Sequence, residues 1–391
     1  MHLKFKADKL FDGYRFLEDD KVLITSTTGV VQDIVSLSEA GDDVQHFKGI
    51  LLPGLINCHC HLELSHLKDI IPPHTGLIEF LCSVVTKRGF SPDTIQAEII
   101  KAEKEMFDNG IIAVGDIGNT ADTADVKSNS SIHWQNFVEV LSFTDAKAEE
   151  NYNNYKNVAE KLEAALAASI ISHRTTLVPH APYSISPKTF ELINEATRGQ
   201  VISIHNQEHP AEDELYKTGG GEYLKLFKIF GLDKSPFPVT GVSSIRSVLP
   251  YFFHGQTIFL IHNTSTQEED IIWANEYAAE NGLKLVYCLC INANLYIENK
   301  VPPIDLLIKH HCHIVLGTDS YSSNWQLSIA KETEAIHKYF PHIPIETILQ
   351  WATINGAKAL RWDDEIGSFE PWKKPGVTLV DPSFQTSKRI L

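Results

Sequence analysis

The hydrophobic and polar positions of the first 52 residues alternate in short runs. Such runs cover 1–8, 22–25, 29–35 and 49–52, and Asp-Gly and Gly-Asp pairs lie between them. Alternation with a period of two is typical of β-strands with one buried face, and these glycine pairs favour turns. No helical spacing of apolar residues is evident in this stretch. The N-terminal segment is therefore predicted to be all β.

From residue 53 to about 360, apolar runs alternate with longer amphipathic stretches. This alternation is the signature of repeated βα units, in which each buried strand is followed by a helix. The candidate strands are 55–61, 111–117, 134–141, 175–180, 201–205, 257–262, 284–289 and 313–317, and helical patterns cover 94–108, 146–168, 187–196, 267–280 and 326–339. Eight such strands predict an α/β fold, a (β/α)₈ barrel of the TIM type.

The end of the chain returns to strand-like patterns at 367–371 and 376–381. We expect these strands to join the N-terminal ones in a small composite β-sandwich built from both termini. The predicted domains are therefore 1–52 with 362–391 for the β-domain, and 53–361 for the barrel.

Composition narrows the choice of partners. The chain has 391 residues and a net charge of -16 without any basic run, which argues against nucleic acid or an anionic membrane as a partner. No apolar run approaches the roughly 20 residues of a membrane-spanning helix, and the start lacks the apolar core of a signal peptide. The six cysteines show no CxxC spacing, so we expect reduced core residues in a cytoplasmic protein that acts on a small-molecule substrate.

Polar residues that can bind metal or move protons end several of the predicted strands. Side chains alternate along a strand, so His59 and His61 share one face at the end of the first. The other strand ends carry His180, His205 with Glu208 three residues later, His262 and Asp319. Active sites of such barrels lie at the carboxyl ends of the strands. A single histidine there is more often structural, but five histidines and an aspartate on one rim predict a site.

Three imidazoles and one carboxylate form a ligand set that suits Zn²⁺ or Fe²⁺ and leaves room for water. We expect one divalent metal, Zn²⁺ first and Fe²⁺ as the alternative. The expected ligands are His59, His61, His205 and Asp319. Such an ion lowers the pKa of its water to around 7, and Asp319 could accept the proton. No lysine ends the fourth strand, so a carbamylated lysine between two metals is not expected.

Two further residues are candidates for proton transfer and substrate polarisation. Glu208 is expected to act as general acid and base, passing a proton to a leaving amine. His262 is either a fourth imidazole ligand or a catalytic residue that orients the hydroxide and polarises the substrate, and we favour the second role.

These motifs resemble the amidohydrolase superfamily, in particular its aminohydrolase and chlorohydrolase branch. The resemblance rests on the stretches 53–63, 180–184, 205–208, 262–263 and 317–320, with 355–360 and 367–371 in the tail. It implies a barrel with a flanking composite β-sandwich, one divalent metal and hydrolytic displacement at a carbon that bears nitrogen or halide. It also implies the ligands His59, His61, His205 and Asp319 and the catalytic residues Glu208 and His262. Cys60 between the first histidines, and Asn206-Gln207 before the glutamate, depart from the usual pattern and leave the substrate subclass open.

The sequence thus predicts a metal-dependent hydrolase of carbon–nitrogen bonds other than peptide bonds. Deamination of a purine, pyrimidine or adenosine-like compound is favoured, with an aminofutalosine-type deaminase as one candidate. Hydrolysis of an amide, a cyclic amide or a carbon–chlorine bond on the same site is the alternative. A non-catalytic binding protein on a retained barrel is a weaker one.

Substrate contacts are harder to assign from sequence. Glu63 shares the strand face of His61 and is expected to contact either the substrate or a structural partner. His180 is expected near the substrate or the metal. Four residues follow the metal aspartate and could line the pocket: Ser320, Ser322, Ser323 and Asn324. Asn324 could equally cap a helix that starts near Trp325.

Four more residues are weighed between the pocket and the surface. Arg88 and Arg246 could hold an anionic group of the substrate, but a surface position is favoured for each. His66 and His74 follow the first strand in a loop that could cover the pocket, and again the surface is favoured. The exposed strands of the β-domain, together with the resemblance, suggest a homodimer.

Overall fold

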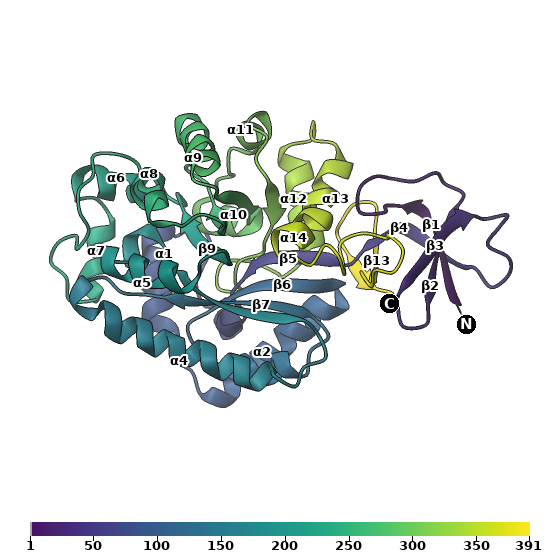
Figure 1. Ribbon diagram of the computed structural model, residues 1–391, viewed down its shortest axis with the longest axis horizontal. Coiled ribbons are helices and arrows are strands. Elements are labelled where there is room, and N and C mark those ends of the chain that lie inside the picture. The colour runs from purple at the N-terminus through teal and green to yellow at the C-terminus, as the bar shows by residue number, and fades with distance from the viewer. Residues whose placement is uncertain (1) are drawn as a thin grey trace.

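The structure is a computed structural model that describes residues 2–391, and its centre is formed by eight parallel strands (Figure 1). They form two four-stranded sheets, in the orders β5-β6-β7-β8 and β12-β11-β10-β9. The strands are β5 Leu55–Cys60, β6 Ile111–Gly118, β7 His133–Val140, β8 His173–Pro179, β9 Val201–Asn206, β10 Thr257–His262, β11 Lys284–Leu289 and β12 Ile314–Leu316. Every predicted strand of this region is present, with ends that differ by no more than two residues.

The two parallel sheets meet near the carboxyl ends of their outer strands. The backbone N–H of His205 donates to the carbonyl of His180 at 2.9 Å, which joins β9 to the end of β8. The N–H groups of Thr318 and Asp319 donate to the carbonyl of His59 at 2.9 and 3.0 Å, which joins the segment after β12 to β5. The fold is thus α/β with parallel sheets, and its outer strands approach each other at the predicted rim.

Helices follow the parallel strands, as the sequence pattern predicts. They are α1 Leu77–Lys87, α2 Pro92–Asp108, α3 Ala124–Ser128, α4 Ala148–Leu166, α5 Pro187–Ala196, α6 Pro210–Thr218, α7 Tyr223–Ile229, α8 Ser244–Val248, α9 Glu268–Glu280, α10 Ile291–Glu298, α11 Ile304–Lys309, α12 Ile329–Tyr339, α13 Ile345–Ala352 and α14 Ile354–Ala359. The expectation of a helix start near Trp325 is wrong. Ser328 caps α12 by accepting from the N–H of Lys331 at 3.4 Å, so this helix begins at Ile329 and Asn324 is not its cap.

Strands from both ends of the chain share one six-stranded sheet, in the order β14-β13-β4-β1-β2-β3. Its strands are β1 His2–Leu10, β2 Lys21–Ser26, β3 Val31–Ser36, β4 Gln45–Pro53, β13 Val377–Val380 and β14 Ser387–Arg389. The C-terminal β13 pairs antiparallel with β4, with Val377 opposite Pro53. Figure 1 shows these strands beside the parallel sheets, with β4 leading into β5. This composite sheet joins both termini as predicted, but it is a single sheet among the described residues, and the predicted second layer of a sandwich is not established.

Among residues 2–391, no helix combines the length and the apolar character needed to cross a membrane. The longest helix, α4, is amphipathic, with Leu162 and Leu166 buried and charged residues on its exposed face. It lies along the parallel strands β7 and β8, as Figure 1 shows for β7.

Candidate active site

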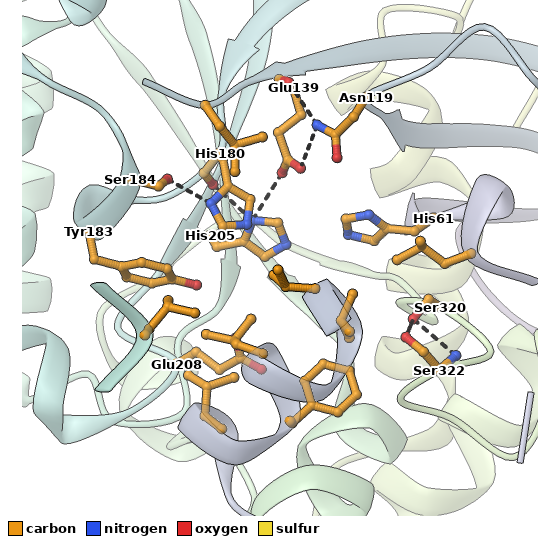
Figure 2. A pocket seen from close by; sticks show the side chains of 18 of the residues that line it. His61, Asn119, Glu139, His180, Tyr183, Ser184, His205, Glu208, Ser320 and Ser322 are labelled. Atoms are coloured by element: carbon orange, nitrogen blue, oxygen red, sulfur yellow. Dashed lines mark hydrogen bonds and ion pairs between the residues drawn. The ribbon is translucent and has the colours of Figure 1, made fainter. Parts of the chain in front are cut away.

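Histidines from three strands and one aspartate converge at the carboxyl ends of the parallel sheets. Side-chain nitrogens of His59, His61 and His205 all lie within 4.8 Å of one another, and so do ligand-type atoms of His59, His262 and Asp319. The Nε2 atoms of His59 and His61 each lie 3.4 Å from Oδ1 of Asp319. Figure 2 shows His61 and His205 facing each other across this space. The four predicted ligands are therefore neighbours in space although 260 positions separate the first from the last.

The backbone around Asp319 brings its carboxylate against β5. Asp319, three residues after the end of β12, adopts a left-handed φ of 59°, which is uncommon outside glycine. Gly317 lets the two segments approach, because a Cβ there would lie 2.7 Å from Cβ of His59 and 3.0 Å from the thiols of Cys288 and Cys290. A close approach of this kind is possible only for glycine. The local conformation thus allows the carboxylate of Asp319 to lie next to the ring of His59.

The donor set fits a divalent cation. His59 is fully buried, yet neither of its ring nitrogens has a hydrogen-bond partner among the described residues. A buried polar group without a partner is costly, and a cation bound between the imidazoles would remove that cost. Burial lowers the pKa of His61 to about 3, and burial with the neighbouring His61 lowers that of His205 to about 4, so both rings are neutral donors.

The carboxylate of the set is ionised. Burial by itself would raise the pKa of Asp319, but the imidazoles of His59, His61 and His262 hold it well below its ordinary value. The hydroxyl of Ser323 also donates to Oδ2 of Asp319 at 2.5 Å. Neutral imidazoles with one carboxylate make up the N and O ligand set that Zn²⁺ and Fe²⁺ accept.

A second layer of groups fixes the ring of His205. Its Nδ1 lies 2.8 Å from the carbonyl of His180 and 3.4 Å from Oε1 of Glu139, so this nitrogen carries the proton and Nε2 is left for the centre of the site. Figure 2 shows Glu139 reaching His205, and His180 held in turn by Ser184, at 2.7 Å. Such partners set the tautomer and the orientation of a metal-binding imidazole.

Glu208 and His262 lie next to the histidine cluster. Oε1 of Glu208 is 3.6 Å from Nε2 of His262, and the amide of Asn294 is 3.2 Å from Nδ1 of the same ring. Burial, and then the charge of Asp319, raise the pKa of Glu208 well above its ordinary value. A protonated carboxyl group beside an imidazole can donate a proton to a bound molecule.

Glu208 and His262 line one pocket together with His61, His205 and Asp319. The polar side chains that line it are His61, Arg88, Asn119, Glu139, His180, Tyr183, Ser184, His205, Glu208, His262, Asp319, Ser320 and Ser322, ten of which are labelled in Figure 2. Apolar side chains with a few convergent polar groups are the usual lining of a small-molecule site.

A family model described as the amidohydrolase family matches residues 50–390. The chain belongs to the amidohydrolase family. The match includes every strand of the parallel sheets and every predicted ligand, so the family expected from the motifs is confirmed, and the protein is an enzyme of the hydrolase class.

The names of several relatives of this amidohydrolase describe deaminases of adenosine analogues. The 5-methylthioadenosine/S-adenosylhomocysteine deaminase of Thermoanaerobacter pseudethanolicus is 27% identical over 348 residues, which cover 85% of this chain and 74% of the relative. The aminodeoxyfutalosine deaminase of Nitratiruptor sp. is 26% identical over 323 residues, covering 79% of this chain and 73% of the relative. The predicted class of reaction agrees with these names.

The fold of this family member is also that of a solved structure, the aminofutalosine deaminase of Helicobacter pylori in complex with methylthio-coformycin. The TM-score is 0.81, with 19% identity over 99% of this chain and 97% of the other. An adenosine deaminase from Xanthomonas campestris, solved with bound zinc, has a TM-score of 0.76 and 21% identity over 97% of this chain and 84% of the other. At these identities the likeness concerns the fold.

The predicted substrate residue Glu63 is committed to protein partners. Its carboxylate accepts from the N–H groups of Asn119 and Thr120, both at 2.9 Å, and from the hydroxyl of Thr120. Arg88 adds an ion pair at 3.2 Å. Glu63 does not line the pocket, so its geometry favours the structural alternative, whereas His180 does line it.

Two of the four predicted residues after Asp319 lie behind the pocket wall. Besides donating to Asp319, Ser323 bonds to the carbonyl of Ser320, and Asn324 donates to the carbonyl of Thr318 at 2.7 Å. Ser320 and Ser322, which were also expected as lining residues, do line the pocket. Ser323 and Asn324 therefore touch the aspartate and its loop, and their direct contact with substrate stays a prediction.

The four residues weighed between the pocket and the surface differ in where the structure places them. Arg88 lines the pocket, while Arg246 is outside it and pairs with Asp270 at 2.7 Å. The surface position favoured for His66 is wrong. His66 is 7% exposed. Its ring nitrogens lie 3.1 Å from the carbonyl of Glu63 and 3.2 Å from that of Arg88, so the ring is held between these two segments. His74 is exposed, as expected.

Sequence reasoning missed Glu139 and Asn119 as pocket residues. Glu139 lies inside the apolar run of β7, where its partner His205 is 66 positions away. A buried acid near the end of a predicted barrel strand was the available signal. Asn119 follows β6 and donates to the carbonyl of Glu139 at 2.8 Å. No motif distinguishes it from other loop asparagines.

Proposed function

We propose that this amidohydrolase removes the exocyclic amino group of an adenosine-like nucleoside by hydrolysis and releases ammonia. One observation carries the proposal. A buried set of three imidazoles and a carboxylate lies beside Glu208, a buried glutamate whose pKa is raised, and His61, His205, Asp319 and Glu208 line one pocket. The names of the relatives, deaminases of adenosine analogues, support the choice of substrate.

In this proposal His59, His61, His205 and Asp319 hold one divalent ion, Zn²⁺ first and Fe²⁺ as the alternative. When bound, such an ion supplies Lewis acidity, which makes water acidic enough to be a nucleophile at neutral pH. His180 and Glu139 keep His205 in the required tautomer.

The protein's own residues then move the protons. Glu208 donates a proton to the ring nitrogen next to the reacting carbon, so that water adds across the C=N bond. Asp319 accepts the proton that the attacking water loses, and His262 polarises the new C–O bond. Asp319 then passes its proton to the amino group, the carbon–nitrogen bond to this group breaks, and the proton of the new hydroxyl group returns to Glu208, so that the products are the oxo nucleoside and ammonia. Glu208 and His262 are 3.6 Å apart, close enough to act on adjacent atoms of one ring.

Several predictions about the whole molecule belong to the same proposal. We propose that the two parallel sheets form one (β/α)₈ barrel, domain 53–361, and that 1–52 with 362–391 form the second domain, a β-sandwich. The hydrogen bonds between β5, the segment after β12, β8 and β9 support the barrel. A homodimer, a cytoplasmic location and the absence of nucleic-acid and membrane partners remain part of the proposal.

The test is release of ammonia from a panel of adenosine derivatives, other aminopurines and aminopyrimidines, by protein loaded with Zn²⁺ or Fe²⁺ and with its metal content determined. The expected result is about one metal per chain and ammonia from an adenosine derivative. Bound metal without ammonia from any member would favour hydrolysis of an amide or a carbon–chlorine bond. Failure to bind metal would refute the site.

A further inference from the structure

One wall of the active-site pocket is an uninterrupted apolar stripe. Helix α1 turns the side chains of Leu77, Phe80, Leu81, Val84 and Val85 toward the pocket. The spacing of three and four residues places all five on one face of the helix. The next position of this face, Arg88, is where the helix ends.

A second wall of the same pocket is apolar as well. It is built by Phe143, which follows β7, and by Leu226 and Phe230 at α7, and it adjoins α1, because Leu81 packs in one cluster with Phe143 and Leu226. The rings of Phe143 and Phe230 pack with their centroids 4.7 Å apart. A molecule whose reacting ring lies beside the histidines would extend its far end along these apolar side chains.

The outer part of this apolar lining is left open to solvent. Val85 is 38% exposed and Phe230 is 40% exposed, although both line the pocket. When an apolar group covers exposed apolar side chains at a pocket, the free energy of the system falls.

The pocket has no free cation for a carboxylate. Arg88 is the only lysine or arginine that lines it among residues 2–391, and its guanidinium already pairs with the buried Glu63 at 3.2 Å. Three acids, Glu139, Glu208 and Asp319, line the same pocket. An anionic group placed against the apolar side chains would find no unpaired cation there, and where it covers them it would give up water without gaining a partner.

From these walls we infer the substrate class: a purine nucleoside whose 5′ substituent is short, uncharged and apolar, rather than one that ends in an amino-acid group. The inference rests on the proposed function and adds to it a choice between substrates. It assigns Val85 and Phe230 as specificity-determining residues that contact the 5′ substituent.

The first experiment compares kcat/KM for 5′-methylthioadenosine, 5′-deoxyadenosine, adenosine and S-adenosylhomocysteine. We expect the methylthio compound to exceed adenosine by about tenfold, the range that small apolar groups reach in apolar pockets, and to exceed S-adenosylhomocysteine by at least that factor. Equal values for the four compounds, or a preference for S-adenosylhomocysteine, would overturn the inference and leave the proposed function intact. If none of the four releases ammonia, the proposed function fails and the inference fails with it.

The second experiment locates the preference in the pocket wall. In Phe230→Ala, kcat/KM for the methylthio compound should fall about tenfold, while the value for adenosine changes less than about twofold. The matched control is Ile229→Ala, an adjacent and equally exposed apolar residue, 43% exposed, that does not line the pocket. A parallel loss on both substrates in Phe230→Ala, or the same loss in the control, would contradict the assignment.

Affinity for the reaction products supplies a readout apart from turnover. The deaminated methylthio product should bind about tenfold more tightly than inosine by calorimetry, and Phe230→Ala should remove this difference. Equal affinities in the unmodified protein would count against the apolar subsite.

Discussion

At the scale of single residues, the site separates groups that hold charge from groups that hold protons. Three surrounding imidazoles lower the pKa of Asp319, whereas burial and the charge of Asp319 raise the pKa of Glu208. The pKa values of two carboxyl groups in one pocket are thus shifted in opposite directions, a common basis for dividing the roles of base and acid.

Substitution of each carboxyl group should separate metal binding from proton transfer. Asp319→Asn should abolish turnover and lower the metal content, because an amide is a weaker ligand than a carboxylate. Glu208→Gln should lower kcat by about 10²–10⁴-fold, the range for loss of a general acid, and leave the metal in place. Elemental analysis and kcat check both. Full activity in either variant would refute the role of that residue.

Gly317→Ala tests the close approach of β12 to β5. The added methyl group would lie 2.7 Å from Cβ of His59, so His59 or the backbone has to move. We expect a loss of stability of about 1–3 kcal/mol, typical of overpacking in a core. Metal content should fall with it. The control is Gly89→Ala, where nothing lies within 4 Å of the added group and φ is not left-handed, and we expect it to leave metal content unchanged. Wild-type metal content in Gly317→Ala would contradict the argument.

At the scale of elements, the sequence predicts the positions of strands well, but it predicts poorly which side chains contact each other across strands and loops. Apolar runs of four to eight residues identify β9 and β10, and the alternation inside β5 brings His59 and His61 to one face. The side-chain partners of His205 and Glu63 are not readable, because they lie on other strands and loops and depend on the twist and register of the sheets. Asn119 was missed for that reason.

A buried ion pair between β6 and α3 supports the segment that carries His61. Nζ of Lys127 lies 2.6 Å from Oδ2 of Asp116, and the two side chains are 2% and 1% exposed. Oδ1 of Asp116 accepts the N–H of Leu62 at 2.8 Å, directly after His61. Burial raises the pKa of Asp116 in spite of the ammonium group beside it. The pair therefore connects the packing of α3 to the position of a predicted ligand.

Lys127→Met should lower the free energy of unfolding by about 3–5 kcal/mol, because it leaves a buried carboxylate without its partner. Metal content should fall as well, since the backbone after His61 loses its anchor. Urea denaturation and elemental analysis provide the measurements. Lys104→Met breaks an exposed pair of the same length, 2.6 Å to Asp108, and should cost less than about 1 kcal/mol. Similar costs in the two variants would rule out the anchoring role.

At the scale of the whole molecule, strands from both termini share one sheet. The alternating pattern of both end segments made this shared sheet predictable. Whether a second sheet faces it could not, because a period of two shows that one face is buried but not what covers it. The same limit applies to the seams of the parallel sheets, which depend on contacts such as that between His59 and Asp319.

Buried carboxyl groups make the stability of the whole molecule depend on pH. Burial raises the pKa of Glu212 from 4.5 to about 8, although its Oε1 accepts from the N–H of Gln207 at 2.9 Å and from the hydroxyl of Ser244 at 2.5 Å. Between these pH values the unfolded chain releases this proton and the folded protein retains it. The stability that Glu212 contributes is therefore full below pH 4.5 and is lost as the pH rises through 8.

Glu212→Gln should flatten that dependence. The amide oxygen can keep both hydrogen bonds and carries no proton to lose, so the free energy of unfolding of the variant should fall less between pH 5 and 8 than that of the parent. Urea denaturation at a series of pH values measures the slope. Glu163→Gln, on the exposed face of α4, should leave the slope unchanged. An identical slope in Glu212→Gln and its parent would mean that Glu212 does not carry the pH dependence of the fold.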